Sequence, residues 1–160
     1  MTVTIIPALD QPEQVGILFA EYTQMLIDGD ATFARYLQMQ HYDEELRQLA
    51  AKYGPPDGRL YLAYDDGQPA GCIALKRHDD ACGELKRLYV RPAYRGRHIG
   101  ERLLRQIVAD ATNIGYRAIV LDTLPFLREA LRLYEKFGFY ETTAYNDSPM
   151  SNSIFLRLDL

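Results

Sequence analysis

The sequence predicts a single α/β domain over residues 1–160, with a mixed, twisted, mostly antiparallel sheet, one central parallel strand pair and helices on both faces. Three observations predict this architecture. Strand-like runs joined by tight turns occupy residues 59–90, which is typical of an antiparallel meander. A strand, a loop and a helix follow one another over residues 84–107. The nearly continuous apolar run Arg117–Asp122 then indicates a strand buried on both faces, as parallel strands usually are.

The first part of the chain predicts one strand and two helices. Residues 2–6 form a β-prone run. A helix is expected from Pro12, a residue suited to the first helical turn, to Gly29. A second helix is expected over Asp43–Tyr53, because the prolines at positions 55 and 56 stop it. Residues 30–41 between the two helices carry no clear pattern.

The middle of the chain predicts the three-stranded meander. Arg59–Tyr64 and Ala70–Lys76 flank an Asp-Gly pair at positions 66 and 67, which is a strong hairpin signal. Cys82–Val90 supplies the third strand.

The last part of the chain completes the two outer layers and the sheet. The helix after the loop has an apolar stripe that begins at Ile99 and repeats every four residues, and Gly115 ends it. After the buried strand, a helix is expected over Phe126–Phe137. Phe139–Tyr145 and Ser153–Leu158 are expected to close the sheet as a final strand pair.

The composition excludes several classes of protein. The 160 residues are 48% hydrophobic and 25% charged with a net charge of −4, so no nucleic-acid partner is expected. No run approaches the about 20 apolar residues of a membrane span, and the N-terminus lacks a leader pattern. We therefore expect a cytoplasmic protein with no membrane partner. Cys72 and Cys82 show neither disulfide nor zinc-site spacing, so no metal is expected.

The strand-loop-helix segment carries an unusual local charge. Seven Lys or Arg residues stand against one acid, Glu101, between Lys86 and Arg105, although the whole chain is acidic. A helix start exposes unpaired N–H groups and carries a partial positive charge. This segment therefore predicts an anionic ligand, and a phosphorylated one fits best.

Two motifs resemble those of a known family. Residues Arg95–Gly100 read Arg-Gly-Arg-His-Ile-Gly, and Ala130–Phe139 read Ala-Leu-Arg-Leu-Tyr-Glu-Lys-Phe-Gly-Phe. They resemble, in this order, the pyrophosphate loop Gln/Arg-x-x-Gly-x-Gly/Ala and the segment Ala-x-x-Leu-Tyr-x-Lys-x-Gly-Phe of the GNAT acetyltransferases. The likeness covers about two thirds of the chain, from Arg59 to the C-terminus.

The resemblance implies an enzyme that transfers an acetyl group from acetyl-CoA directly to the amine of a small-molecule or amino-acid-like acceptor. No metal is implied, and the chain could form a homodimer. Direct transfer is expected because neither cysteine lies in a recognisable nucleophile setting. Three alternatives stay open: an acceptor that is a protein lysine or N-terminal amine, a non-catalytic acyl-CoA-binding regulatory module, and a nucleotide-binding protein. The last is the weakest, because Gly-Lys-Ser/Thr is missing.

The resemblance also assigns cofactor-binding residues. Backbone groups on the strand before the loop would bind the pantetheine arm, because a strand splayed from its neighbour leaves unpaired amides; these residues are Leu88, Tyr89 and Val90. Backbone amides of the loop would hold the pyrophosphate; these residues are Arg95, Gly96, Arg97, His98, Ile99 and Gly100.

Two side chains receive catalytic roles from the same resemblance. Tyr134 would protonate the leaving thiolate, and Glu84 stands where many members keep a general base. The chemistry needs such a base, because an amine of pKa about 10 is mostly protonated at neutral pH. The amide of Leu88 would polarise the thioester carbonyl. Tyr134 could instead be a core aromatic residue, and Glu84 could be an ion-paired strand residue.

Two positions depart from the family pattern. His98 occupies the place of the first motif glycine, where a side chain is expected only with ordinary helix-start geometry and not with φ > 0. Its imidazole could cap a phosphate or face solvent. Leu127 stands where many members have an Asn that faces the cofactor, and Thr123 could take over that contact.

The acceptor side is less defined. The resemblance places it between the first helices and the last strand pair, with Tyr22, Phe33, Tyr36, Tyr42, Tyr145 and residues 146–152 as candidates. Six acids and two bases between Glu21 and Ala50 could favour a cationic amine, or be a solvated face. Conversely, Lys76, Arg77 or Arg87 could hold a substrate carboxylate.

Overall fold

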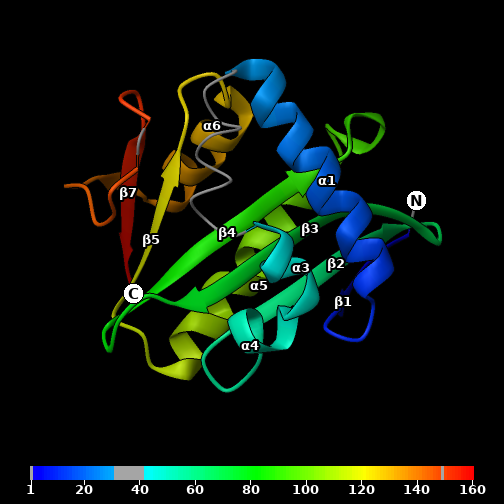
Figure 1. The fold of residues 1–160 in the computed structure, drawn as a ribbon, viewed down its shortest axis with the longest axis horizontal. Coiled ribbons are helices and arrows are strands. Elements are labelled where there is room, and N and C mark those ends of the chain that lie inside the picture. The colour runs from blue at the N-terminus through cyan, green and yellow to red at the C-terminus, as the bar shows by residue number, and fades with distance from the viewer. Residues whose placement is uncertain (1, 31–41, 149) are drawn as a thin grey trace.

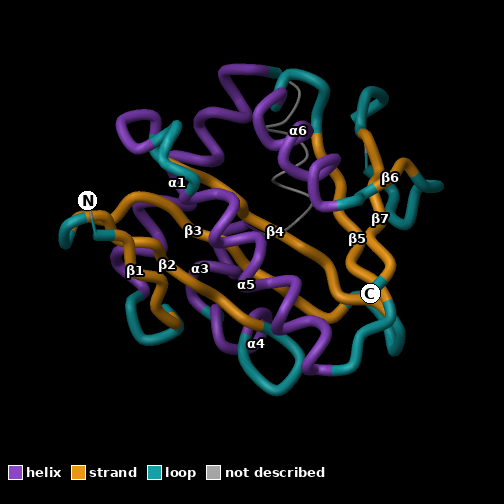
Figure 2. The backbone as a smooth tube through the Cα atoms, turned by 180° about the vertical axis from the view of Figure 1, so that it is seen from behind, coloured by secondary structure: helices purple, strands orange, loops and turns teal. Residues whose placement is uncertain are grey.

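The chain forms a seven-stranded mixed sheet with helices on both faces, which confirms the predicted fold class (Figures 1 and 2). The computed structural model describes residues 2–30, 42–148 and 150–160. The strand order is β1-β2-β3-β4-β5-β7-β6. Among the described strands, β4 and β5 pair in parallel and the other neighbours pair antiparallel. No helix in this described part is long and apolar enough to cross a membrane.

The first elements follow the predicted order with one difference. Strand β1 spans Val3–Pro7 and helix α1 spans Pro12–Gly29. The helix predicted over Asp43–Tyr53 is divided into α3, Tyr42–Arg47, and α4, Leu49–Tyr53. It breaks because Gln48 between them has a φ of −130° and a ψ of 47°, outside the helical region. The patternless segment lies largely outside the described residues.

The meander is formed as predicted by β2, Arg59–Asp65, β3, Gln68–Arg77, and β4, Cys82–Val90. Asp66 and Gly67 both have positive φ, 49° and 83°, as a two-residue hairpin turn requires.

The remaining elements build the second half of the sheet. They are the 3-10 turn η1, Pro92–Tyr94, helix α5, Ile99–Ile114, strand β5, Ala118–Thr123, helix α6, Arg128–Phe137, and strands β6, Tyr140–Glu141, and β7, Ile154–Asp159. The predicted strand Phe139–Tyr145 is reduced to two residues, because the chain leaves the sheet after pairing Glu141 with Leu156.

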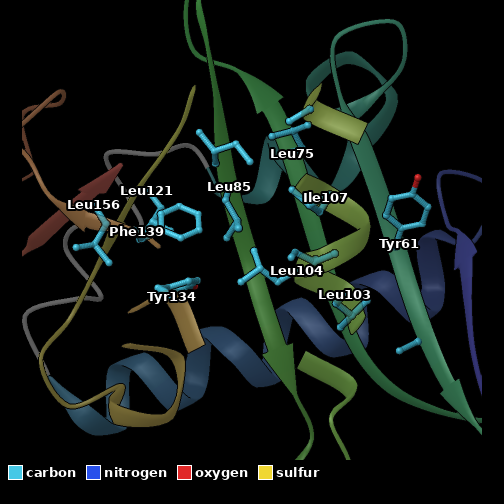
Figure 3. Close-up of a cluster of buried hydrophobic side chains, with 14 of the residues drawn as sticks. Tyr61, Leu75, Leu85, Leu103, Leu104, Ile107, Leu121, Tyr134, Phe139 and Leu156 are labelled. Carbon is cyan, nitrogen blue, oxygen red and sulfur yellow. The ribbon is translucent and has the colours of Figure 1, made fainter. Parts of the chain in front are cut away.

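Two apolar layers hold the helices on opposite faces. On one face α5 and α6 pack on the sheet, and Figure 3 shows Leu103, Leu104 and Ile107 of α5 in one cluster with Leu75 and Leu85. On the other face, a second cluster joins α1 and α4 to the side chains of β2 and β3. These layers fix both walls around the centre of the sheet.

The central parallel pair is short, and this opens the sheet. Strands β4 and β5 pair over three positions that end at Glu84 and Val120, and then they diverge (Figure 1). A β-bulge follows in β4, where the register against β3 shifts and Arg87 has a φ of 63°. Bulges bend a strand and increase its twist. Within the residues that the structure describes, the end of β4 therefore has an unpaired edge toward β5.

Candidate active site

A cleft of about 870 Å³ lies where β4 and β5 diverge. Its walls come from α1, the carboxyl ends of β4 and β5, the start of α5, and α6. Ligands of open α/β sheets bind at this edge, and the volume is that of a typical small-molecule site.

The predicted pantetheine-binding residues Leu88, Tyr89 and Val90 all line this cleft. Tyr89 and Val90 pair with β3 on one side, while the other side of this segment lies beyond its pairing with β5. The open edge offers backbone groups to an extended ligand in the manner of an added strand.

The predicted pyrophosphate loop forms the neighbouring wall. Five of its six residues line the cleft, namely Arg95, Gly96, His98, Ile99 and Gly100. Gly96 has a φ of 80°, so the turn needs a left-handed residue at this position. Arg97 differs, because its guanidinium binds Asp65 Oδ2 at 2.7 Å and lies 5.5 Å from the Tyr94 ring centre. Its side chain therefore anchors the loop to β2.

The expectation for the backbone of His98 is wrong. Its φ is 61°, in the left-handed region, and it precedes the first residue of α5. This conformation costs a non-glycine residue about 1 kcal/mol. The ring is 80% exposed, and its Nδ1 lies 3.2 Å from Glu101 Oε2. The turn into α5 thus retains the geometry of a glycine with a histidine in its place.

Glu101 ties the two helices of this wall together. One carboxylate oxygen accepts hydrogen bonds from Lys136 of α6 and Arg105 of α5, both at 3.0 Å. The hydrogen bond from Lys136 is the largest influence and lowers the pKa of Glu101. Weaker hydrogen bonds from His98 and Arg105 also lower this pKa, whereas desolvation by burial raises it. The acid therefore remains ionised and holds the start of α5 against the end of α6.

Tyr134 lines the cleft from α6, as a thiolate-protonating residue must. Its side chain is buried beside Phe139, with ring centres 5.5 Å apart (Figure 3). Burial raises the pKa of the phenol, and the charges of Tyr22 and Asp122 add to the shift. The hydroxyl is therefore protonated at neutral pH. Its neighbourhood also includes Thr123 and Leu127, which both line the cleft.

Glu84 is not among the residues that line the cleft, as far as the described residues define it. The carboxylate is buried, and it accepts a 2.7 Å hydrogen bond from the Tyr145 hydroxyl. The ammonium groups of Lys76 and Lys86 lie 3.7 and 3.8 Å from its oxygens. Its role as a base stays a prediction. Because Glu84 does not line the described cleft, its carboxylate would not contact a ligand there directly.

Asp122 is the carboxylate of β5 that lines the cleft, and the sequence did not single it out. Its charge raises the pKa values of both Tyr22 and Tyr134, after the larger effect of burial on each, which places it near both phenols. Asn146 Nδ2 donates to its Oδ2 at 3.4 Å. The sequence feature that could have indicated Asp122 is its position, because it is the polar residue that ends the apolar run of β5 at the carboxyl edge of the sheet.

A buried charge pair joins β4 to α3 beside the cleft. Arg87, which lines the cleft, pairs with Glu45 of α3, and its guanidinium lies 5.3 Å from the Phe19 ring centre. Lys52 Nζ lies 3.0 Å from the same carboxylate, and Tyr53 donates to it. Burial opposes ionisation of Glu45, but the charges of Arg87 and Lys52 outweigh it and lower the pKa to about 2.

The other predicted acceptor residues are distributed as follows. Tyr22 lines the cleft, together with Met150 and Ser153 from the segment before β7. Tyr145 lies outside the described lining, against Glu84 and the ring of His78. Phe33, Tyr36 and the side chain of Tyr42 lie outside the described residues. Of the three cations predicted for a carboxylate, Lys76, Arg77 and Arg87, only Arg87 belongs to the described lining, which also includes Lys86.

Within the described ranges, no group of three or more His, Cys, Asp or Glu side chains could hold a metal ion.

Comparison with known proteins identifies relatives along the whole chain. Residues 24–139 match the model of the Acetyltransferase (GNAT) family. An uncharacterised N-acetyltransferase of Schizosaccharomyces pombe is 37% identical over 94% of this chain and 98% of its own length. N-acetylaspartate synthetase of Danio rerio is 34% identical over 71% of this chain and 42% of its own.

Solved structures share the fold. An acetyltransferase from Streptococcus agalactiae superposes with a TM-score of 0.78 at 23% identity, over 99% of this chain and 98% of that chain. A GNAT family acetyltransferase from Elizabethkingia anophelis, solved with acetyl-CoA bound, gives a TM-score of 0.64 at 25% identity over the same shares.

Proposed function

Because the chain belongs to the acetyltransferase (GNAT) family, we propose that it is an acetyl-CoA-dependent N-acetyltransferase that acts by direct transfer on a small-molecule or amino-acid-like amine. The observation that carries the proposal is that one cleft is lined by the open β4 edge, the Arg95–Gly100 loop and Tyr134. The acetyl-CoA in the structure from Elizabethkingia anophelis supports the choice of donor.

The residues of this wall suit the parts of acetyl-CoA, which would supply the activated acetyl group. The unpaired edge at Leu88–Val90 would bind the amide-containing pantetheine arm through backbone groups. The left-handed turn at Gly96 and the start of α5 would direct N–H groups to the pyrophosphate. The amide of Leu88 would stabilise the oxyanion formed when the amine attacks.

Tyr134 would give its proton to the CoA thiolate, because its phenol is protonated and lines the cleft. The proton of the amine needs a carboxylate. Glu84 could take it only through an intermediary, because the described cleft lining excludes it. Asp122 lines the cleft and is the better-positioned acceptor of this proton. We therefore assign the base role to Asp122 and retain Glu84 as the alternative.

A small acceptor is favoured over a protein amine or a non-catalytic role. The name of the relative from Danio rerio denotes an N-acetylated amino acid, which supports an amino-acid-like acceptor. A regulatory module without catalysis has no need for a phenol at the cleft, whereas Tyr134 lies there.

Two measurements test the proposal. Calorimetry of the purified chain with acetyl-CoA should show saturable binding. Thiol release should then be followed with polyamines, arylalkylamines, amino acids and lysine peptides. We expect release with at least one small amine. Binding of acetyl-CoA without turnover on any amine would support the non-catalytic module, and turnover confined to peptides would support a protein acceptor.

A further inference from the structure

Lys86 is a charged group of the cleft that the proposed reaction does not use. Its side chain is 12% exposed and lines the cleft. The ammonium lies 3.8 Å from Glu84 Oε2, beyond hydrogen-bonding distance, and it donates no hydrogen bond within the described part of the chain. A mostly buried ammonium with three N–H donors calls for a polar partner. The cleft is where that partner can bind.

Lys86 lies in a group of side chains with more positive than negative charges. Two carboxylates each form ion pairs with two cations. Glu84 pairs with Lys76 and Lys86, and Glu45 pairs with Lys52 and Arg87. Lys86 and Arg87 both lie close enough to lower the pKa of Lys52, after the larger effects of burial and Glu45. An anionic group on the ligand would balance this excess of positive charge.

Asp122 stands at the corresponding level of the neighbouring strand. Lys86 lies two residues beyond Glu84, and Asp122 lies two residues beyond Val120, the partner of Glu84 on the last paired position. Residues two apart on a strand share a face, and paired strands lie about 4.8 Å apart. Both side chains line the cleft where the strands begin to separate. One cation and one anion thus line the cleft from adjacent strands.

We propose that the acceptor is an α-amino acid, with its carboxylate bound by Lys86 and its amine at Asp122. The inference rests on the proposed function and adds a free carboxylate beside the reacting amine. An α-amino acid carries both groups on one carbon, which matches a cation and an anion on adjacent strands. An amine within a protein chain has no such carboxylate, so protein acceptors are not substrates of this site.

The transfer step itself is unchanged by the carboxylate site. The nitrogen forms a bond to the acetyl carbon while the bond from that carbon to the CoA sulfur breaks. The ammonium first gives one proton to Asp122, and the sulfur takes the proton of Tyr134. The second proton that the nitrogen loses as the amide forms goes to the Tyr134 phenolate, which restores the phenol. Lys86 changes no bond and acts by binding the acceptor, so its loss should act mainly on KM.

The wild-type protein provides the first test. The twenty proteinogenic L-amino acids are assayed with acetyl-CoA, and the best is compared with its carboxamide and with its decarboxylated amine. We expect kcat/KM for the acid to exceed that for both analogues by about tenfold or more, because a charge-assisted contact is lost in each. Equal or better use of the amide or the amine would overturn the inference and leave the transferase function standing.

Variants locate the carboxylate site. Lys86→Met should raise KM for the amino acid about tenfold or more and remove the preference over the carboxamide, with KM for acetyl-CoA unchanged. Lys86→Arg should retain part of the preference. Lys76→Met is the matched control, because Lys76 pairs with the same Glu84 but lies outside the described cleft lining, so the preference should persist. A Lys86→Met protein that keeps the full preference would overturn the assignment. If the wild-type protein does not bind acetyl-CoA, the proposed function itself is refuted.

Discussion

The Tyr145 hydroxyl donates a 2.7 Å hydrogen bond to the Glu84 carboxylate, and both residues lie outside the described cleft lining. The carboxylate predicted as the base is thereby engaged by a side chain from the segment after β6. Asp122, on the adjacent strand, lines the cleft near Tyr134 instead. The two carboxylates have different access to a ligand, and this difference can be measured.

Asp122→Asn should lower kcat/KM about 100-fold or more at neutral pH, because the amine then lacks a proton acceptor in the cleft. Activity should recover as the pH approaches the amine pKa of about 10, where the acceptor loses its proton unaided. Glu84→Gln should lower kcat/KM less than tenfold and keep the wild-type pH profile. A larger loss in Glu84→Gln, with recovery at high pH, would return the base role to Glu84.

Tyr134→Phe should lower kcat about tenfold or more while KM for acetyl-CoA stays nearly unchanged, because the ring still packs beside Phe139 and only the proton is lost. Steady-state kinetics with varied acetyl-CoA measures both constants. Tyr140→Phe serves as the control, because its hydroxyl binds Asp159 on the surface. Wild-type turnover in Tyr134→Phe would exclude the phenol as the acid.

Glu45→Gln should reduce the free energy of unfolding at neutral pH by about 3 kcal/mol, because Arg87 would lose its buried ionic partner. The sign of the pH dependence follows from the lowered pKa. The pKa of Glu45 is about 2 in the folded chain and has its ordinary value of 4.5 in the unfolded chain, so its stabilisation is full above pH 4.5 and is lost as the pH falls toward 2.

Urea unfolding at several pH values checks this prediction. The free energy of unfolding of the wild type should fall more steeply than that of Glu45→Gln between pH 4.5 and 2, because only the wild type loses the contribution of Glu45. Other carboxylates with a lowered pKa, such as Glu21 and Glu101, contribute equally to both proteins. The exposed Glu135→Gln is the control and should change stability by less than about 0.5 kcal/mol. Parallel curves for wild type and Glu45→Gln would contradict the assignment.

His98→Gly should raise the free energy of unfolding by up to about 1 kcal/mol, because glycine adopts a φ of 61° without steric cost. His98→Ala keeps the Cβ and should give no such gain. Thermal and urea unfolding of the two variants separate backbone strain from loss of the ring. Greater stability in His98→Ala than in His98→Gly would show that the left-handed conformation is not strained.

The sequence was informative wherever local rules set the structure. Asp66-Gly67 specified its hairpin because few other residues accept two positive φ values in succession. The apolar run at β5 marked the buried parallel strand, and Gly115 ended α5 in the left-handed conformation, with a φ of 105°.

Features that depend on tertiary contacts could not be predicted in this way. No local rule indicates a left-handed Arg87, whose conformation accompanies the register shift against β3 and a buried partner from α3. The hydrogen bond that engages Glu84 comes from Tyr145, which is 61 residues away in the chain. Asp122 does not stand out in the sequence, because a single polar residue at the end of an apolar strand is common.

The stoichiometry of the reaction tests whether the acetyl group passes directly from acetyl-CoA to the acceptor amine. The chain is mixed with acetyl-CoA and the amino acid panel, and mass spectrometry follows the N-acetylated acceptor and the protein while a thiol reagent follows CoA. Direct transfer predicts one N-acetylated acceptor for each thiol released and an unchanged protein mass. Thiol release without an N-acetylated product, or an acetylated protein that forms before the product, would contradict it.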